Sequence, residues 1–253
     1  MRLLAALRSW WGMVHLGAMA MVLAVTPATF GGASRRATAR YIYASTWQVL
    51  PWFTVLSTLV SLVLIRIVLV TAYSYGLSQF ALEMMVRVLV LELIPLAAAL
   101  FVALRAGLGY RIGASRLTLA QTLSADESNR LLRTELVPAV VGSTFAVLSL
   151  AMVSIVIVLL LAYLNVYGMS PWGLTDYTRT VGRVFEPTVT IGFALKSLLF
   201  GLAVAVIPIA ALREQMDRPA SARAEPSGVQ PGAIRLLTVL LLIEAASLAV
   251  KTI

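Results

Sequence analysis

The segment LVPAVVGSTFAVLSLAMVSIVIVLLLAYL, residues Leu136 to Leu164, carries no charged side chain and decides the fold class. A helix needs about 20 mainly apolar residues to cross the roughly 30 Å hydrocarbon core of a bilayer. The whole chain shares this character, since 60% of its 253 residues are hydrophobic and 12% are charged. Soluble domains contain about 25% charged residues. These features predict an integral membrane protein.

Four further apolar runs lie on either side of this segment, each with at most one charged residue near its centre. They are Trp47 to Val70, Val86 to Leu104, Val189 to Leu212 and the shorter Ile234 to Val250. Each is long enough to cross a bilayer as a helix. The sequence therefore predicts an all-α, polytopic membrane protein with about five transmembrane helices.

Residues 1–253 are predicted to form a single membrane domain without a soluble part. Its parts are an interfacial amino-terminal segment (1–46), four spans (47–212) with a cytoplasmic loop (106–135), a cytoplasmic linker (213–232) and the last span (233–253). The linker is polar and rich in Pro, Ala and Gly, a composition typical of flexible connections.

The amino-terminal run Ser9 to Phe30 has basic residues on both sides, namely Arg2, Arg8, Arg35, Arg36 and Arg40. Basic residues favour the cytoplasmic side, so both ends of the run are expected to stay inside. We interpret the run as a helix that lies in or dips into the inner leaflet. A sixth span and a signal peptide remain open as alternatives.

The basic residues also predict the orientation of the spans. With the amino terminus inside, the cytoplasmic segments hold five, five and four arginines, fourteen altogether, whereas four basic residues lie on the outer side. This is a strong positive-inside bias. It predicts a cytoplasmic amino terminus, and it explains the net charge of +9 without a nucleic-acid partner.

Motifs of catalysis are absent from the sequence. The chain has no cysteine and a single histidine, His15, so we expect no metal site. It contains no Walker A, G-x-S-x-G or H-E-x-x-H pattern. We therefore expect no catalytic residues and no cofactor in this chain; if ATP drives the protein, a separate chain binds and hydrolyses the nucleotide.

Four ionisable residues fall inside the apolar runs: Arg66, Glu92, Lys196 and Glu244. Each costs a few kcal/mol in a membrane unless it is paired or hydrated. Glu92 and Lys196 lie at similar depth, so a contact between them is allowed, and Glu244 could join it. This buried charge cluster is expected either to fix helix packing or to take part in gating. Arg66 lies close enough to the outer end of its span to snorkel.

The loop 106–135 is the sizeable cytoplasmic segment between spans. Ser124 and Glu127 match a capping box, which predicts a short helix that lies at the interface or docks on a soluble partner. The polar residues of this loop that could contact such a partner are Arg116, Thr118, Asp126, Glu127, Arg130 and Arg133.

Two stretches resemble the MlaE/YrbE permeases, the membrane subunits of MCE-associated ABC lipid transporters. In LELIPLAAALFVALRAGLGYRIG, Leu91 to Gly113, the residues in register with the family signature include Glu92, Pro95, Arg105, Gly107 and Gly113. FALKSLLFG, Phe193 to Gly201, is similar to a second family motif and matches it at Lys196 and Ser197. Glu244 occupies the place of a family acidic residue.

The chain also departs from the family pattern. Leu91 stands where the family usually has Arg, and Arg111 stands where it has Glu. The coupling segment ends in Asn129, Arg130 and Leu131 rather than in the family's Asp-Pro.

The resemblance implies a homodimeric, ABC exporter-like permease in the bacterial inner membrane. Its expected partners are an ABC ATPase subunit, which contacts the coupling loop, an MCE-domain protein and membrane lipid. The implied activity is ATP-driven movement of a lipid, such as a phospholipid, between the inner membrane and the MCE protein for outer-membrane lipid homeostasis. The alternative from the residues themselves is an ion- or proton-coupled secondary transporter that uses Glu92, Lys196 and Glu244.

Overall fold

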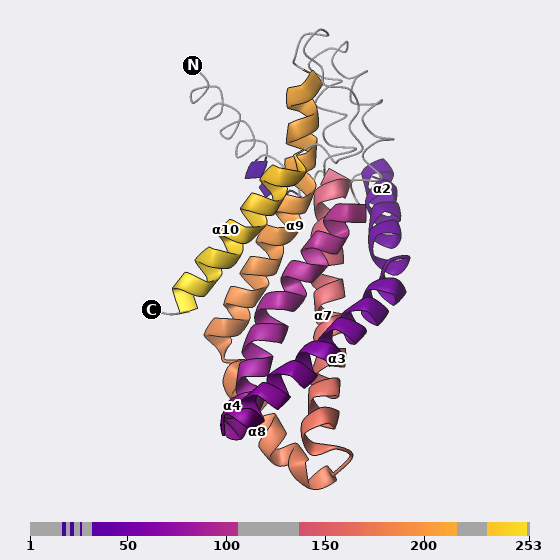
Figure 1. Cartoon of the computed structure of the whole chain (residues 1–253). Coiled ribbons are helices and arrows are strands. Elements are labelled where there is room, and N and C mark those ends of the chain that lie inside the picture. Colours follow the sequence, from indigo (N-terminus) through magenta and orange to yellow (C-terminus); the bar gives the residue numbers. More distant parts are fainter. Residues whose placement is uncertain are drawn as a thin grey trace.

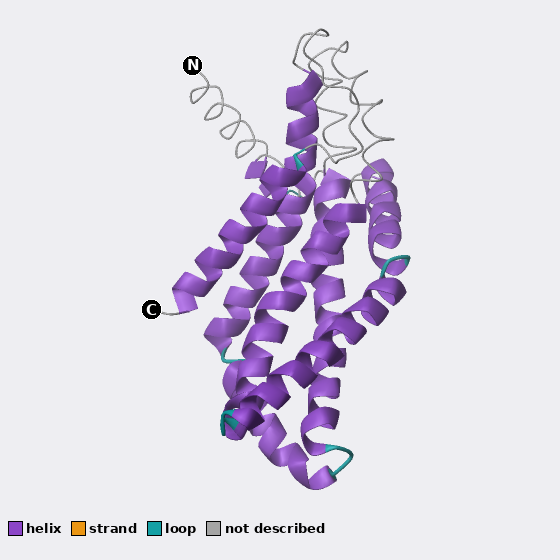
Figure 2. Ribbon diagram, viewed as in Figure 1, coloured by secondary structure: helices purple, strands orange, loops and turns teal. Residues whose placement is uncertain are grey.

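The structure is a computed structural model that describes residues 17–18, 21–22, 26, 32–105, 137–216 and 232–251. The described part contains helices and short connections and no strand, as Figure 2 shows. The predicted all-α class is therefore confirmed.

Five helices are long and apolar enough to cross a membrane, as the sequence predicts. These candidate spans are Thr38–Ser74, Phe80–Arg105, Val137–Tyr167, Pro187–Ala211 and Ala233–Val250. The first begins nine residues before the predicted start at Trp47, because α2 (Gly32–Ile42) continues through the π-helix η2 (Tyr43–Trp47) towards α3 (Leu50–Ser74).

The second span is built from three consecutive helical pieces. These are α4 (Ser78–Met85), the π-helix η3 (Val86–Leu93) and an α-helix over residues 94–105. A π-helix bonds each amide to the carbonyl five residues earlier, and such segments occur frequently at functional sites. This irregular stretch carries Glu92.

The remaining spans are α7 (Val137–Tyr167), α9 (Pro187–Met216) and α10 (Ala233–Lys251). α7 is central: it packs extensively against α9 and also contacts α2 and α3, whereas α10 packs along α9. In Figure 1, α10 lies beside α9, and α3 crosses the bundle obliquely.

The contact between α7 and α9 is very close. A Cβ atom built on Gly201 would lie 2.4 Å from the Cα of Thr144. At this place Ser143 Oγ donates a hydrogen bond of 3.2 Å to the Gly201 carbonyl. Small residues allow such approach between membrane helices, where dispersion contacts and interhelical hydrogen bonds replace the hydrophobic effect.

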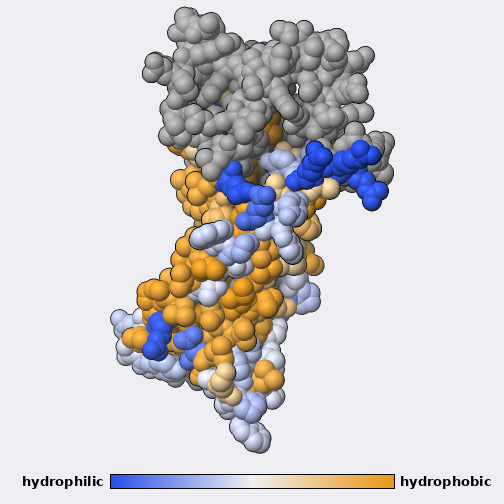
Figure 3. Space-filling view, turned by 90° about the vertical axis from the view of Figure 1, so that its right-hand side faces the viewer, coloured by the Kyte–Doolittle hydropathy of each residue, from blue (hydrophilic) through white to orange (hydrophobic). Residues whose placement is uncertain are grey.

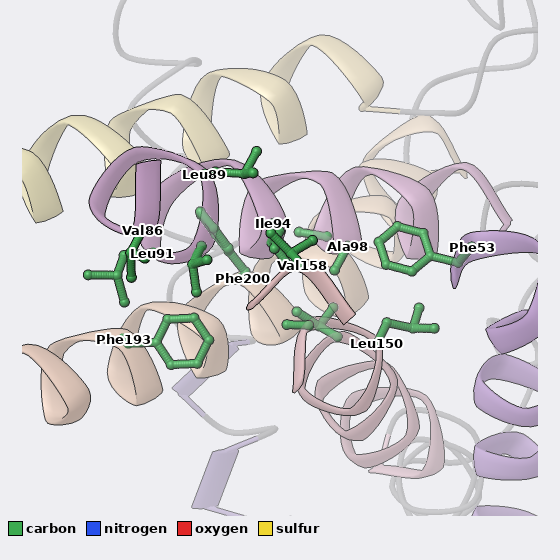
Figure 4. Close-up of a cluster of buried hydrophobic side chains, with 14 of the residues drawn as sticks. Phe53, Val86, Leu89, Leu91, Ile94, Ala98, Leu150, Val158, Phe193 and Phe200 are labelled. Atoms are coloured by element: carbon green, nitrogen blue, oxygen red, sulfur yellow. The ribbon is translucent and has the colours of Figure 1, made fainter. Parts of the chain in front are cut away.

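Apolar side chains from all five candidate spans contribute to the core. Figure 4 shows Phe53 of α3, Leu150 of α7 and Phe200 of α9 around the second span, together with its Ile94 and other core residues. Phe200 is fully buried. The core thus holds together the spans that carry the charged residues.

Two spans are poorly covered by the rest of the chain. Only 22% of the apolar window is buried for Thr38–Ser74 and 11% for Ala233–Val250, against 67% for Pro187–Ala211. Their exposed residues are large and apolar, including Trp52 and Leu59 on α3 and Ile234 on α10. Figure 3 shows a broad hydrophobic band over the described part of the side that carries α2 and α3. These faces suit contact with lipid or with another helix.

A short cap joins α7 to α9 at one end of the bundle. It consists of the 3-10 helix η5 (Pro171–Gly173) and the amphipathic helix α8 (Leu174–Val184). Tyr177 of α8 donates a hydrogen bond of 2.7 Å to the Leu159 carbonyl of α7. Its ring also lies edge-on to those of Tyr163 and Tyr167. The aromatic cluster anchors α8 on the end of α7.

Candidate functional site

Three charged side chains from three different helices converge inside the bundle. Glu92 comes from η3, Lys196 from α9 and Glu244 from α10. Lys196 Nζ contacts Glu92 Oε2 and lies 2.8 Å from Glu244 Oε1, with Oε2 of the same carboxyl also at 2.8 Å. We call this group the charge cluster.

The charge cluster is buried. The Lys196 side chain is 2% exposed, and the side chains of Glu92 and Glu244 are each 13% exposed. Removing the ammonium from such a group leaves uncompensated charge in a medium of low polarity, which is strongly destabilising. The cluster therefore ties the second span, α9 and α10 together.

The ammonium of Lys196 has a third acceptor in the backbone. Its Nζ donates a hydrogen bond of 3.2 Å to the carbonyl of Leu91, which neighbours Glu92 in η3. An ammonium carries three N–H donors, and the two carboxyl groups and this carbonyl match them. The Phe200 ring, one turn further along α9, has its centre 5.8 Å from Nζ, within the range of a cation–π contact.

The charge cluster has two carboxyl groups for one ammonium. When both carboxyl groups are ionised, the three side chains carry a net negative charge, and when one binds a proton they are neutral. Arg87, the nearest basic residue to Glu92 along η3, pairs instead with Glu83 at 3.0 Å on the surface. This arrangement can hold helices together, and it can also exchange a proton.

The family described as Permease MlaE matches residues 38–211. The chain belongs to the MlaE permease family. No curated protein matches the sequence. The MlaE match covers the first four candidate spans, including Glu92 and Lys196, whereas Glu244 lies beyond it on α10. This chain is thus a multi-pass membrane permease, a transporter subunit rather than an enzyme.

The MlaE motif residues within the described ranges take separate positions. Pro95 is buried in the second span, three residues after Glu92. Ser197 is fully buried, and its hydroxyl has no hydrogen-bond partner among the residues that the structure describes. Arg105 Nη2 donates a hydrogen bond of 2.7 Å to Gln48 Oε1, which joins the end of the second span to the junction of η2 and α3 in the first. Gln48 was not singled out from the sequence.

Arg66 is separate from the charge cluster. It lies on an exposed face of α3, eight residues before Ser74 at the end of the helix. Its neighbours on this face include the exposed apolar residues Val63 and Val70. That Arg66 snorkels remains a prediction.

Several predicted site residues lie outside the described ranges. These are Gly107, Gly113 and the coupling residues Arg116, Thr118, Asp126, Glu127, Arg130 and Arg133. The amino-terminal run 9–30 also lies outside, apart from residues 17–18, 21–22 and 26. Within the ranges that are described, no group of three or more His, Cys, Asp or Glu residues could hold a metal ion.

Proposed function

We propose that this MlaE permease is the membrane subunit of an ATP-driven lipid transporter, and that a phospholipid is its substrate. The observation that carries the proposal is the family match over residues 38–211. The spans within residues 38–211 contain the buried Glu92–Lys196 ion pair. The sequence lacks a nucleotide-binding motif. A permease of this kind needs a partner chain to supply the energy of ATP hydrolysis.

Two copies of the chain would form the transport path. The poorly covered apolar faces of α3 and α10 support this proposal, because exposed helix faces of this size can pack against a second copy. A cavity between two such faces would be lined by apolar side chains and would suit acyl chains. Lipid and the second copy are therefore the proposed occupants of these faces.

The loop 106–135 is the proposed contact with the ATPase subunits. It connects the second span with α7, the helix that contacts both α9 and α3. Movement of this loop would therefore reach the central helix of the bundle directly. ATP would be bound by the partner subunit alone.

The charge cluster would make three spans move together. Because Lys196 binds groups on η3 and α10, a displacement of α9 would draw both along. In this role the charge cluster would transmit force between the three helices. Separation of its charges during the transport cycle would be a gating step.

The remaining parts of the proposal concern location and the second partner. The positive-inside bias supports a cytoplasmic amino terminus in a bacterial inner membrane. An MCE-domain protein would then meet the opposite side, where α8 caps the bundle, and would exchange lipid with the permease for outer-membrane lipid homeostasis. Among the exposed residues at this cap are Trp172 and Leu174.

A second candidate function is proton-coupled secondary transport. The observation that favours it is the excess of carboxyl groups over ammonium groups in the charge cluster. In this case Glu92 or Glu244 would bind and release a proton during transport, and no ATPase partner would be required.

Affinity purification in mild detergent separates the two functions. Copurification of an ABC ATPase and an MCE-domain protein in stoichiometric amounts, with bound phospholipid and ATPase activity, is the result expected of an ABC permease. A lone chain without ATPase activity would contradict it and favour secondary transport. Mass spectrometry of the copurified proteins and lipids provides the readout.

A further inference from the structure

Pro95 lies in the second span one turn after the backbone that contacts Lys196. In an α-helix the amide of each residue donates to the carbonyl four residues earlier. Residues 94–105 are α-helical and follow directly on η3, and in the α-helical register an amide at position 95 would donate to the carbonyl of Leu91. Proline has no N–H and cannot make this bond.

The carbonyl of Leu91 accepts a hydrogen bond from a different helix instead. Its donor is Lys196 Nζ on α9, at 3.2 Å. Leu91 is 3% exposed, so water has little access to replace a missing donor. A buried carbonyl without a partner is costly, and the ammonium prevents that cost here.

We infer that Pro95 is a positioning residue for Lys196: by removing a competing amide, it leaves the Leu91 carbonyl as the third acceptor of the ammonium. The inference concerns the geometry of the cluster and holds whatever the permease carries.

Backbone anchoring has a consequence for the cluster. With the Leu91 carbonyl as a ligand, Lys196 stays attached to the second span even when the Glu92 carboxyl is neutral. One of the two contacts between Lys196 and the second span is then independent of the charge state of Glu92. Each carboxyl group can change its protonation state without separating the two helices.

The test is a double-mutant cycle on the thermal unfolding midpoint of the purified chain in detergent. Pro95→Ala is placed in the native chain and in a neutral background that carries Glu92→Gln, Lys196→Met and Glu244→Gln. In the native chain we expect Pro95→Ala to lower the midpoint, because the new amide competes with the ammonium for Leu91. In the neutral background we expect it to raise the midpoint, because the amide satisfies a carbonyl that has lost its donor.

Pro208→Ala is the matched control. Pro208 also lies inside a spanning helix, but it is twelve residues beyond Lys196 on α9. Pro208→Ala is expected to shift the unfolding midpoint by the same amount in both backgrounds. An equal shift for Pro95→Ala in both backgrounds would overturn the inference, as would a higher midpoint in the native chain.

A second measurement does not require the neutral background to fold. The chain contains two lysines, Lys196 and Lys251, so the rate of reductive methylation at each can be followed by mass spectrometry. Relative to Lys251, we expect Pro95→Ala to speed the modification of Lys196 at least tenfold and Pro208→Ala to leave it unchanged. An unchanged rate at Lys196 in Pro95→Ala would contradict the positioning role.

Discussion

Lys196 of α9 and Glu244 of α10 form a buried ion pair with nitrogen and oxygen 2.8 Å apart. Only 11% of the apolar window of α10 is buried, and Leu236 and Leu240 are its buried apolar residues. The ion pair adds a polar attachment of the last span to α9, and Glu244 lies outside the part of the chain that matches the family.

Lys196→Met tests the contribution of the charge cluster to stability. It leaves two carboxyl groups in a buried place without their ammonium, and the expected loss of stability is about 3–5 kcal/mol. Chemical unfolding in detergent measures this loss. The triple variant with Glu92→Gln and Glu244→Gln removes all three charges and is expected to recover most of it. If the triple variant is less stable than the single one, the loss has another cause.

Gly201→Val tests the close contact of α7 and α9. The added side chain has no room beside Thr144, and we expect a loss of about 1–3 kcal/mol from overpacking. Gly192→Val is the matched control on the same helix, because a Cβ at Gly192 meets no atom within 4 Å. The control is expected to change stability by no more than about 0.5 kcal/mol. Equal losses in the two variants would argue against tight packing at Gly201.

Ionisation of Tyr177 is expected to make the stability of the α8 cap depend on pH. Burial, and more weakly the neighbouring Tyr167, raises the pKa of Tyr177 from 10 to about 12. Since the folded pKa lies above the unfolded one, the stabilisation is complete below pH 10 and is lost as the pH rises through 12. Ultraviolet absorbance of tyrosinate and unfolding between pH 9 and about 12 would measure both properties.

Tyr177→Phe is the control for this pH effect. It removes the hydroxyl that ionises and also the hydrogen bond to Leu159, so we expect a loss of about 0.5–1.5 kcal/mol at neutral pH. Its stability should then fall less steeply above pH 10 than that of the native chain. An identical pH dependence in the two chains would assign the effect to other groups.

The absence of native cysteine makes the membrane orientation easy to test. Thr175→Cys places a thiol at an exposed position of α8, and Ser227→Cys places one in the linker that the sequence predicts to be cytoplasmic. In intact cells a membrane-impermeant maleimide is expected to label the first thiol and to reach the second only after permeabilisation. The reverse pattern would invert the proposed orientation.

The five spans were predictable because length and hydrophobicity alone decide them. The contact of Glu92 with Lys196 could also be predicted, since two opposite charges at similar depth in a membrane favour each other. The third ligand of Lys196 could not, because the Leu91 carbonyl is a backbone group whose availability depends on local helix geometry. Pro95 was the one sequence signal that pointed to it.

Two other features were missed for different reasons. α8 is amphipathic, and its buried residues Tyr177 and Val184 lie two turns apart on one face. This helical spacing was present in the sequence but lies in a short loop between spans. The hydrogen bond of Arg105 to Gln48 joins residues 57 positions apart. Because the Gln48 side chain is a neutral amide, the sequence did not indicate which residue it would bind.

The most direct test of the central claim is lipid transport in proteoliposomes that contain the permease with its copurified partners. The account predicts that a fluorescent phospholipid moves when ATP is supplied, and that Lys196→Met reduces the rate at least tenfold while the complex still assembles. Movement that needs a pH gradient and is indifferent to ATP would contradict the account.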